Sequence, residues 1–214
     1  ISPSEFIPIA EDTGLIIPIG EWVLDRACAD LARWRRNGLP PVPVSVNVSV
    51  KQMKEGGLTR SVKRALEIYE LPPELLHLEI TESSLMENRR AVLDSIVELS
   101  TLGVGFSIDD FGTGYSSLSY LKKLPIHTVK IDRSFVIGLP DNSADAALIE
   151  AIVTMVHGLE MTVIAEGVDQ QAQVDFLTSH GCDQIQGFLF SRPLEPSEFV
   201  RFVRRVSPNL NDAE

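Results

Sequence analysis

Short apolar runs alternate with longer amphipathic stretches along this chain. In the first run, Val44, Val46 and Val48 alternate with polar residues, which is the period of a strand. We predict six strands, at residues 42–50, 76–80, 105–108, 128–131, 162–165 and 184–186. Strands separated by helices are typical of a parallel sheet, because parallel neighbours need a crossover connection.

The amphipathic stretches predict the helices between these strands. Their apolar residues recur every three or four positions, and Ser4 and Asn88 can cap helix starts. The predicted helices span residues 4–9, 21–36, 58–69, 88–102, 117–123, 144–159, 170–179 and 197–206. In the second helix, Trp22, Leu31 and Trp34 share a helical spacing that predicts a place in the core.

This alternation favours an α/β fold, a closed TIM-like (β/α)8 barrel. The chain has no Gly-rich dinucleotide fingerprint, which weighs against a Rossmann sheet. Six strands are fewer than the eight that closure normally requires. Residues 1–6 read as a loop entering a helix, so we expect the N-terminal strands of the barrel to precede Ile1. We assign residues 1–206 to this domain and residues 207–214 to a C-terminal tail.

Composition narrows the classes of function. The chain has 214 residues, 44% of them hydrophobic, which is enough for the core of one domain. Its 30 acidic and 19 basic residues give a net charge of −11, which argues against a nucleic-acid polymer as partner. Cys28 and Cys182 lack metal-site spacing, and no run is apolar enough to span a membrane. We expect a cytoplasmic domain, with any membrane anchor of the parent protein in segments outside this chain.

Polar residues accompany the apolar runs, mostly at their C-terminal ends. They are Asn47, Glu79, Asp109, Asp110, Lys130, Glu166 and Gln186. In a barrel, the carboxyl ends of the strands meet at the face that carries the active site. Oxygen ligands suit hard cations such as Mg²⁺ or Mn²⁺, and adjacent aspartates repel one another unless cations lie between them. These residues therefore indicate a two-metal site.

Each of these residues also has a plain structural interpretation. A single strand-end acid can cap the next helix, although capping is the poorer account of all four acids together. Lys130 either points into the barrel, where the acids would pair with it, or lies in the helix layer. The segment at residues 111–117, with Gly112 and Gly114, is either a mobile lid or a simple turn.

Five segments of the chain resemble the signature blocks of a known family. They read EITE at residues 79–82, DDFGTGYSSL at 109–118, VKID at 129–132, AEGV at 165–168 and QGF at 186–188. These segments are similar to those of EAL domains, which are bacterial cyclic di-GMP phosphodiesterases. The resemblance implies a modified (β/α)8 barrel with one antiparallel strand. It also implies a metal-dependent hydrolysis of cyclic di-GMP to linear pGpG.

The resemblance implies a role for each polar residue. The implied metal ligands are Asn47, Glu79 and Asp109 at the first cation, Asp110 at the second or bridging position, and Glu166 at the second cation. The implied catalytic residues are Lys130, which positions the attacking water, Glu166, which is the alternative general base, and Gln186, which orders water. The implied lid loop and its support are Glu82, Phe111, Gly112, Thr113, Gly114 and Asp169. Asp169 stands where the family usually has glutamate.

The resemblance also implies cofactors and partners. We expect Mg²⁺ or Mn²⁺ with inhibition by Ca²⁺, cyclic di-GMP as substrate, a homodimer, and sensory or GGDEF domains upstream. The Glu-Ala-Leu motif that names the family contains a metal-binding glutamate and is expected before Ile1, so we expect little activity from residues 1–214 alone. The alternative is a cyclic di-GMP receptor without activity. Such receptors typically lose metal-binding acids, and the matching acids are present here, so we prefer the enzyme.

Overall fold

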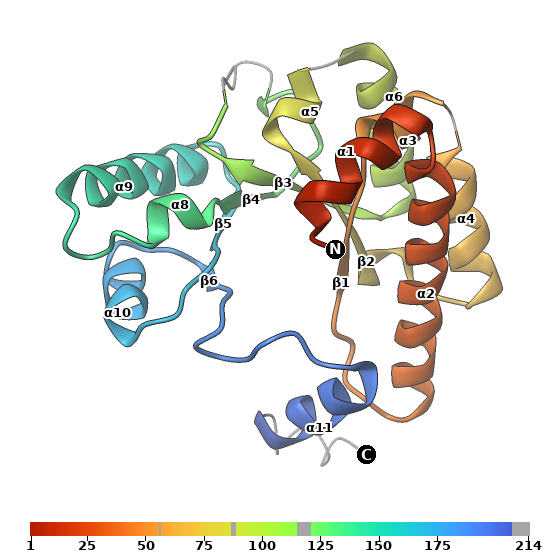
Figure 1. Ribbon diagram of the computed structural model, residues 1–214. Coiled ribbons are helices and arrows are strands. Elements are labelled where there is room, and N and C mark those ends of the chain that lie inside the picture. The colour runs from red at the N-terminus through yellow and green to blue at the C-terminus, as the bar shows by residue number, and fades with distance from the viewer. Residues whose placement is uncertain (56, 87–88, 115–120, 207–214) are drawn as a thin grey trace.

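The strands form one curled, parallel sheet. The structure, a computed structural model, describes residues 1–55, 57–86, 89–114 and 121–206. Within them the strands are β1 (Val44–Asn47), β2 (Leu76–Thr81), β3 (Gly105–Phe111), β4 (Thr128–Ile131), β5 (Thr162–Ala165) and β6 (Gln184–Ile185). Each strand pairs in parallel with its neighbours in sequence, which leaves β1 and β6 as edges. The sheet curls into part of a barrel (Figure 1), as the predicted class of fold requires.

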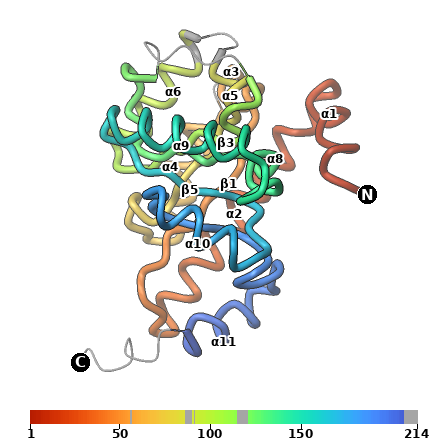
Figure 2. The backbone as a smooth tube through the Cα atoms, turned by 90° about the vertical axis from the view of Figure 1, so that its left-hand side faces the viewer, coloured from red at the N-terminus to blue at the C-terminus, as the bar shows by residue number. Residues whose placement is uncertain are grey.

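Helices surround this sheet. They are α1 (Pro3–Thr13), α2 (Ile16–Arg36), α3 (Val50–Lys54), α4 (Leu58–Ile68), α5 (Glu82–Met86), α6 (Arg89–Leu102), α8 (Arg133–Val136), α9 (Ser143–Gly158), α10 (Gln171–Ser179) and α11 (Pro196–Val206), with a 3-10 helix, η1 (Pro73–Leu75). Figure 1 shows α2 and α4 on the side of β1 and β2, and α8, α9 and α10 on the side of β4 and β5. In Figure 2, α1 projects from the rest of the molecule. The predicted helix at 117–123 lies mostly outside the described residues.

Several element boundaries differ from the prediction. The first strand is shorter, because Ser49 caps α3: its hydroxyl accepts the Lys51 N–H, and its own N–H donates to Gln52. Helix α2 begins earlier than residue 21, since Pro18 lies in its first turn, where a backbone N–H is not needed. The sequence pattern does not predict α3, α5 or α8, which have five residues or fewer. Such helices are too short to show a helical period.

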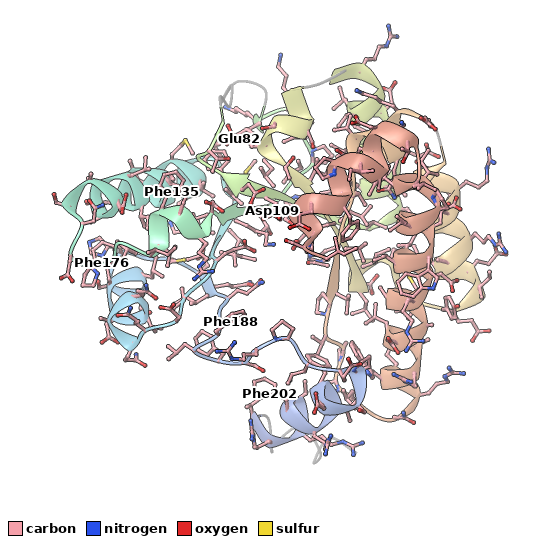
Figure 3. The ribbon with its side chains drawn as sticks, in the orientation of Figure 1. Glu82, Asp109, Phe135, Phe176, Phe188 and Phe202 are labelled. Atoms are coloured by element: carbon pink, nitrogen blue, oxygen red, sulfur yellow. The ribbon has the colours of Figure 1, made fainter. Side chains whose placement is uncertain are left out.

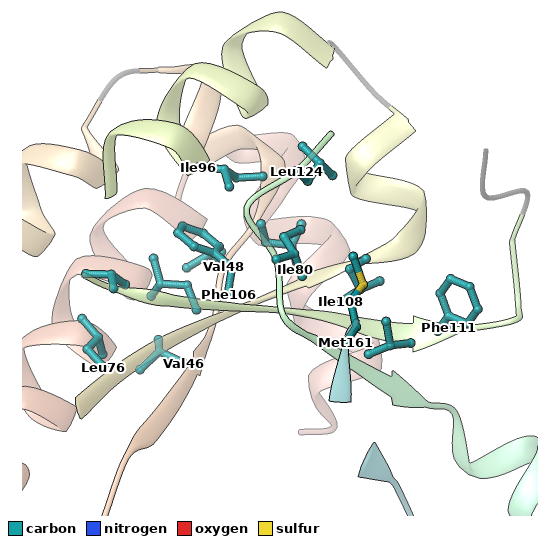
Figure 4. Close-up of a cluster of buried hydrophobic side chains, with 14 of the residues drawn as sticks. Val46, Val48, Leu76, Ile80, Ile96, Phe106, Ile108, Phe111, Leu124 and Met161 are labelled. Carbon is teal, nitrogen blue, oxygen red and sulfur yellow. The ribbon is translucent and has the colours of Figure 1, made fainter. Parts of the chain in front are cut away.

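The core lies between the sheet and its helices. In β2, Leu76, Leu78 and Ile80 are fully buried and alternate with His77 and Glu79. Apolar side chains of the other strands and of the helices complete this cluster, part of which Figure 4 shows. Each fully buried leucine or isoleucine stabilises the fold by about 1.5–3 kcal/mol. The strands therefore turn their apolar side chains toward the helices and their polar side chains toward the inner face.

One predicted core residue is exposed. Trp22 has 69% of its surface exposed, so its predicted place in the core is wrong. Helix α2 packs through Leu24, Cys28 and Leu31, which share one side of the helix and are buried. Trp22 lies two positions before Leu24, on the opposite side of the helix, because each residue advances by about 100°.

Candidate active site

The inner face of the sheet collects the polar residues of the strands. Side chains alternate between the two faces of a strand, and pairing decides which of them are neighbours. Glu79 of β2 pairs with Asn47 of β1 and with Ser107 of β3. Two residues further along β2, Thr81 pairs with Asp109 of β3. Residues far apart in sequence thus form neighbouring rows on this face.

Lys130 is the centre of this polar face. Its side chain comes from β4 and is 5% exposed. Its ammonium lies 2.7 Å from Glu79 Oε2, 2.6 Å from Glu166 Oε1 and 3.3 Å from Asp109 Oδ1. Lys130 therefore points into the barrel and not into the helix layer. We call Lys130, Glu79, Asp109 and Glu166 the lysine cluster.

The lysine cluster shifts the pKa of its members. Burial alone would lower the pKa of Lys130, but the hydrogen bonds that it donates to Glu166 and Glu79, and their charges, raise it. Burial raises the pKa of Glu166, and the lysine opposes that change. The charges of Asp109 and Glu79 add to the increase. At Glu166, burial and the neighbouring acids outweigh the lysine, so the pKa values of Lys130 and Glu166 both rise.

The adjacent aspartates lie inside β3 and not after it. Pairing of β3 with β4 continues to Phe111, with a register shift between Ile108 and Phe111. Within this shift, Asp110 has a φ of 54°, in the left-handed region. Asp109 contacts Lys130, whereas burial and the charge of Asp109 raise the pKa of Asp110. The irregularity therefore gives the two carboxylates different surroundings.

Glu82 holds the loop that follows β3. It is 2% exposed at the start of α5, and its Oε2 accepts the N–H groups of Gly112 at 2.9 Å and Gly114 at 3.3 Å. Gly112 has a φ of 100°, and a Cβ there would lie 2.8 Å from the ring of Phe135. Glycine is therefore required at this position. Figure 3 shows Glu82 above Asp109, and the loop residues 115–117 lie outside the described part.

Three predicted site residues lie at the margin of the lysine cluster. The side chains of Asn47, Gln186 and Asp169 are exposed, and no described hydrogen bond joins them to it. Asn47 is nonetheless next to Glu79 in the sheet. Gln186 follows β6 and lines a cavity of about 510 Å³ together with Phe188. The structure thus brings Glu79, Asp109 and Glu166 together with Lys130, but leaves these three outside that contact network.

The oxygen donors of this face are of the type that binds a hard cation, but the described residues do not form a complete coordination site. In the part of the chain that the structure describes, no group of three His, Cys, Asp or Glu side chains is arranged to hold an ion. Ser107, which sequence reasoning missed, is 3% exposed, and its hydroxyl has no hydrogen-bond partner among the described residues. Its one sequence signal is its place two residues before Asp109. An unsatisfied hydroxyl beside Glu79, with carboxylates in excess of Lys130, fits a bound cation and its water.

Comparison with known proteins identifies the family. The family model described as EAL domain matches residues 1–193, so the chain belongs to the EAL domain family. It is 47% identical to MucR of Pseudomonas aeruginosa, a bifunctional diguanylate cyclase/cyclic di-GMP phosphodiesterase, over 95% of this chain and 30% of MucR. It is 41% identical to NbdA, a cyclic di-GMP phosphodiesterase of the same organism, over 95% of this chain and 26% of NbdA.

A solved structure supports the same assignment. The MucR phosphodiesterase in complex with cyclic di-GMP has a TM-score of 0.89 and 48% identity, over 93% of this chain and 81% of that one. The chain spans less than a third of the length of the curated relatives MucR and NbdA. Among the described helices, none has the length and apolar character needed to cross a membrane.

Proposed function

We propose that this chain is the phosphodiesterase domain of a signalling protein and hydrolyses cyclic di-GMP to linear pGpG. The lysine cluster carries the proposal: a buried ammonium and three carboxylates meet on the inner face of a parallel sheet. MucR and NbdA, which are similar to this chain, are both cyclic di-GMP phosphodiesterases. The solved MucR structure that matches this fold contains the same nucleotide.

The proposed cofactor is Mg²⁺ or Mn²⁺. The residues that would hold two ions are Asn47, Glu79, Asp109, Asp110 and Glu166. When bound, the ions would lower the pKa of a shared water and offset negative charge on the phosphoryl oxygens. Positive charge at the site would also explain how a chain of net charge −11 accepts an anionic substrate. We expect Ca²⁺ to inhibit, because it prefers longer bonds and looser coordination.

The side chains of the site divide the remaining work. Lys130, with its raised pKa, stays protonated at neutral pH and can orient a water or a phosphate oxygen, but it is a poor proton acceptor. Glu166 is the better candidate for taking a proton if it does not hold the second cation, because its pKa is raised in the absence of metal. Gln186 would order water, and Glu82, with support from Asp169, would keep the loop after β3 in place.

We also propose an arrangement for the parent protein. Residues 1–206 would form the EAL domain, which pairs as a homodimer, and residues 207–214 a tail. Sensory or GGDEF domains, a membrane anchor and the strand with the Glu-Ala-Leu motif would precede Ile1. The cyclase activity in the name of MucR, of which this chain covers 30%, supports further domains.

Incubation with cyclic di-GMP tests this function. The chain is assayed with Mg²⁺, Mn²⁺ or Ca²⁺, next to the same chain joined to the natural residues that precede Ile1. We expect pGpG with Mg²⁺ and Mn²⁺, none with Ca²⁺, and faster turnover by the longer form. Because the described residues do not form a complete cation site, a cyclic di-GMP receptor without activity is the second candidate. Binding of cyclic di-GMP without pGpG from either form would support the receptor and overturn the enzyme.

A further inference from the structure

Gln173 is a buried polar side chain of α10 that joins two other segments. It is 1% exposed. Its Oε1 accepts the backbone N–H groups of Asp169 at 2.9 Å and Gln170 at 3.1 Å. Its Nε2 donates to the backbone carbonyl of Val136 at 3.2 Å. Both ends of the amide are therefore engaged with main chain, so the side chain acts as a fixed link.

Each of the two linked segments follows a member of the lysine cluster in the sequence. Val136 ends α8, which begins shortly after Lys130 in β4. Residues 169–170 end the loop that begins with Glu166 after β5. The Glu166 N–H also donates to the Ile131 carbonyl at 3.2 Å, at the end of β4. The side-chain amide of Gln173 thus links the backbone that follows Lys130 to the backbone that follows Glu166. These two residues form the 2.6 Å ion pair.

The loop after β5 is also fixed on its other side. The Val168 N–H donates to the Gln186 carbonyl at 3.1 Å. A Cβ at Gly187 would lie 1.9 Å from the Val168 carbonyl oxygen, so the two backbones touch. The loop therefore lies between Gly187 on one side and Gln173 on the other. Any shift of the Gln173 link would move the segment that presents Glu166.

Helix capping alone does not account for this side chain. The bonded groups are donors at the start of α10 and an acceptor at the end of α8, where a helix leaves such groups unpaired. Capping side chains, water and 3-10-type hydrogen bonds can satisfy such groups within one helix end. Gln171, in the same turn of α10, is exposed and donates to Asp175 at 2.9 Å. Gln173 instead spans from α10 to α8, which fixes the position of one helix relative to the other.

We propose that Gln173 is a positioning residue that sets the separation of Lys130 and Glu166 by tying the backbone after β4 to the backbone after β5. The inference deepens the proposed function and rests on it for the effect on turnover. The described hydrogen bonds of Gln173 go to the backbone and not to either charged side chain, so it acts through the two segments. A positioned group that moves by about 1 Å can lower a rate about 100-fold.

Three variants of the chain, each joined to the natural residues that precede Ile1, test the link. Gln173→Leu has a similar size and removes both halves of the amide. Gln173→Glu keeps an acceptor for residues 169–170 and loses the donor to the Val136 carbonyl. Gln171→Leu is the matched control, since it changes the same residue type on the exposed side of the same helical turn.

The first readout is hydrogen exchange of single backbone amides, without metal or substrate. In Gln173→Leu, exchange of the Glu166 and Val168 amides should rise about tenfold relative to the amides of α6. In Gln173→Glu, the Glu166 amide should also exchange faster while the Asp169 amide stays protected. Gln171→Leu should match the wild type. A general loss of stability would instead accelerate all segments equally.

The second readout is turnover of cyclic di-GMP with Mg²⁺. For Gln173→Leu, kcat should fall about 100-fold while KM changes less than about twofold. Equal acceleration of exchange across the chain, or an unchanged kcat with a loosened loop, would overturn the proposal. If Gln173→Leu does not fold, an unchanged exchange rate of the Glu166 amide in Gln173→Glu also overturns the proposal. If the wild type has no turnover even when joined to the natural residues that precede Ile1, the proposed function fails, while the exchange data still decide whether the link exists.

Discussion

Polar contacts lie at the two ends of β5 and differ in their balance of acidic and basic groups. At the carboxyl end, buried Lys130 contacts three carboxylates, including that of Glu166. At the amino end, His157 Nε2 lies 2.9 Å from Asp183 Oδ2, with side chains 42% and 39% exposed. The same carboxylate accepts the Val163 N–H at 2.7 Å. One end has acids in excess, and the other pairs a single carboxylate with a single imidazole.

The pKa directions follow this difference. Burial opposes ionisation of Asp183, but hydrogen bonds from the Val163 N–H and from His157 lower its pKa overall. Burial and neighbouring acids raise the pKa of Glu166. A satisfied pair at the amino end of a barrel strand is typical of a stabilising contact. An excess of buried acids at the carboxyl end lacks such an explanation, and it marks where cations and chemistry are expected.

Removal of the central lysine should have the largest effect. In Lys130→Met, buried carboxylates lose their cation, so the free energy of unfolding should fall by about 3–5 kcal/mol and turnover should be lost. Urea denaturation with a chelator present measures the first effect. The double variant Lys130→Met/Glu79→Gln should recover part of the loss, because it removes one unpaired charge. A loss below about 1 kcal/mol would mean that the lysine cluster is weakly coupled, like a surface pair.

Matched aspartate variants sharpen the comparison between the two ends. Asp109→Asn should lower kcat by about 100-fold or more, because it removes a proposed cation ligand. Its stability without metal should be unchanged or higher, since repulsion among the acids decreases. Asp183→Asn should show the reverse, with normal turnover and lower stability. Pairs of kcat values and denaturation midpoints for both variants check this, and parallel behaviour of the two would contradict it.

Loss of the Glu82 carboxylate, which holds the loop after β3, should have an intermediate effect. Glu82→Ala leaves the Gly112 and Gly114 N–H groups without their charged acceptor, which costs about 1.5–3 kcal/mol locally. Exchange of these two amides should accelerate, and kcat should fall. Glu98→Ala is the control, because this glutamate pairs with Lys63 on the surface. Unchanged exchange at Gly112 would show that Glu82 does not hold the loop.

The smallest effect concerns acid stability at the amino end of β5. Asp183 has a lowered pKa in the fold, so its contribution is present above the ordinary value of 3.8 and is lost as pH falls through the folded pKa. Solvent exposure limits the contribution to below about 1 kcal/mol. Denaturation between pH 2 and pH 6 should therefore show a slightly steeper acid loss for the wild type than for Asp183→Asn. Identical curves would remove Asp183 from the stabilising contacts.

Sequence reasoning predicts the strands well, because their apolar residues reflect burial. Strands β4 and β5 have the predicted bounds, and all six strands are present. The end of β3 was harder to predict, since Asp109 and Asp110 are acidic residues inside a strand. Pairing of buried Phe111 with Ile131 extends that strand, and this contact is invisible to a local pattern.

The candidate site is predictable in its residue types but not in its contacts. The strand-end pattern identifies the acids and Lys130, while the sharing of one ammonium among three carboxylates depends on strand register. Ser107 and Gln173 carry little sequence signal, because burial of a small or amide side chain is set by tertiary packing. A glutamine three residues after Gln170 is a weak hint of a helix cap.

The most direct test of the account is pGpG production with Mg²⁺ by three proteins: the wild type, Asp109→Asn and Asp183→Asn. Each is assayed with the natural residues that precede Ile1. We predict turnover by the wild type and by Asp183→Asn, and a loss of about 100-fold or more in Asp109→Asn. Normal turnover by Asp109→Asn would contradict the assignment of the catalytic site to the lysine cluster.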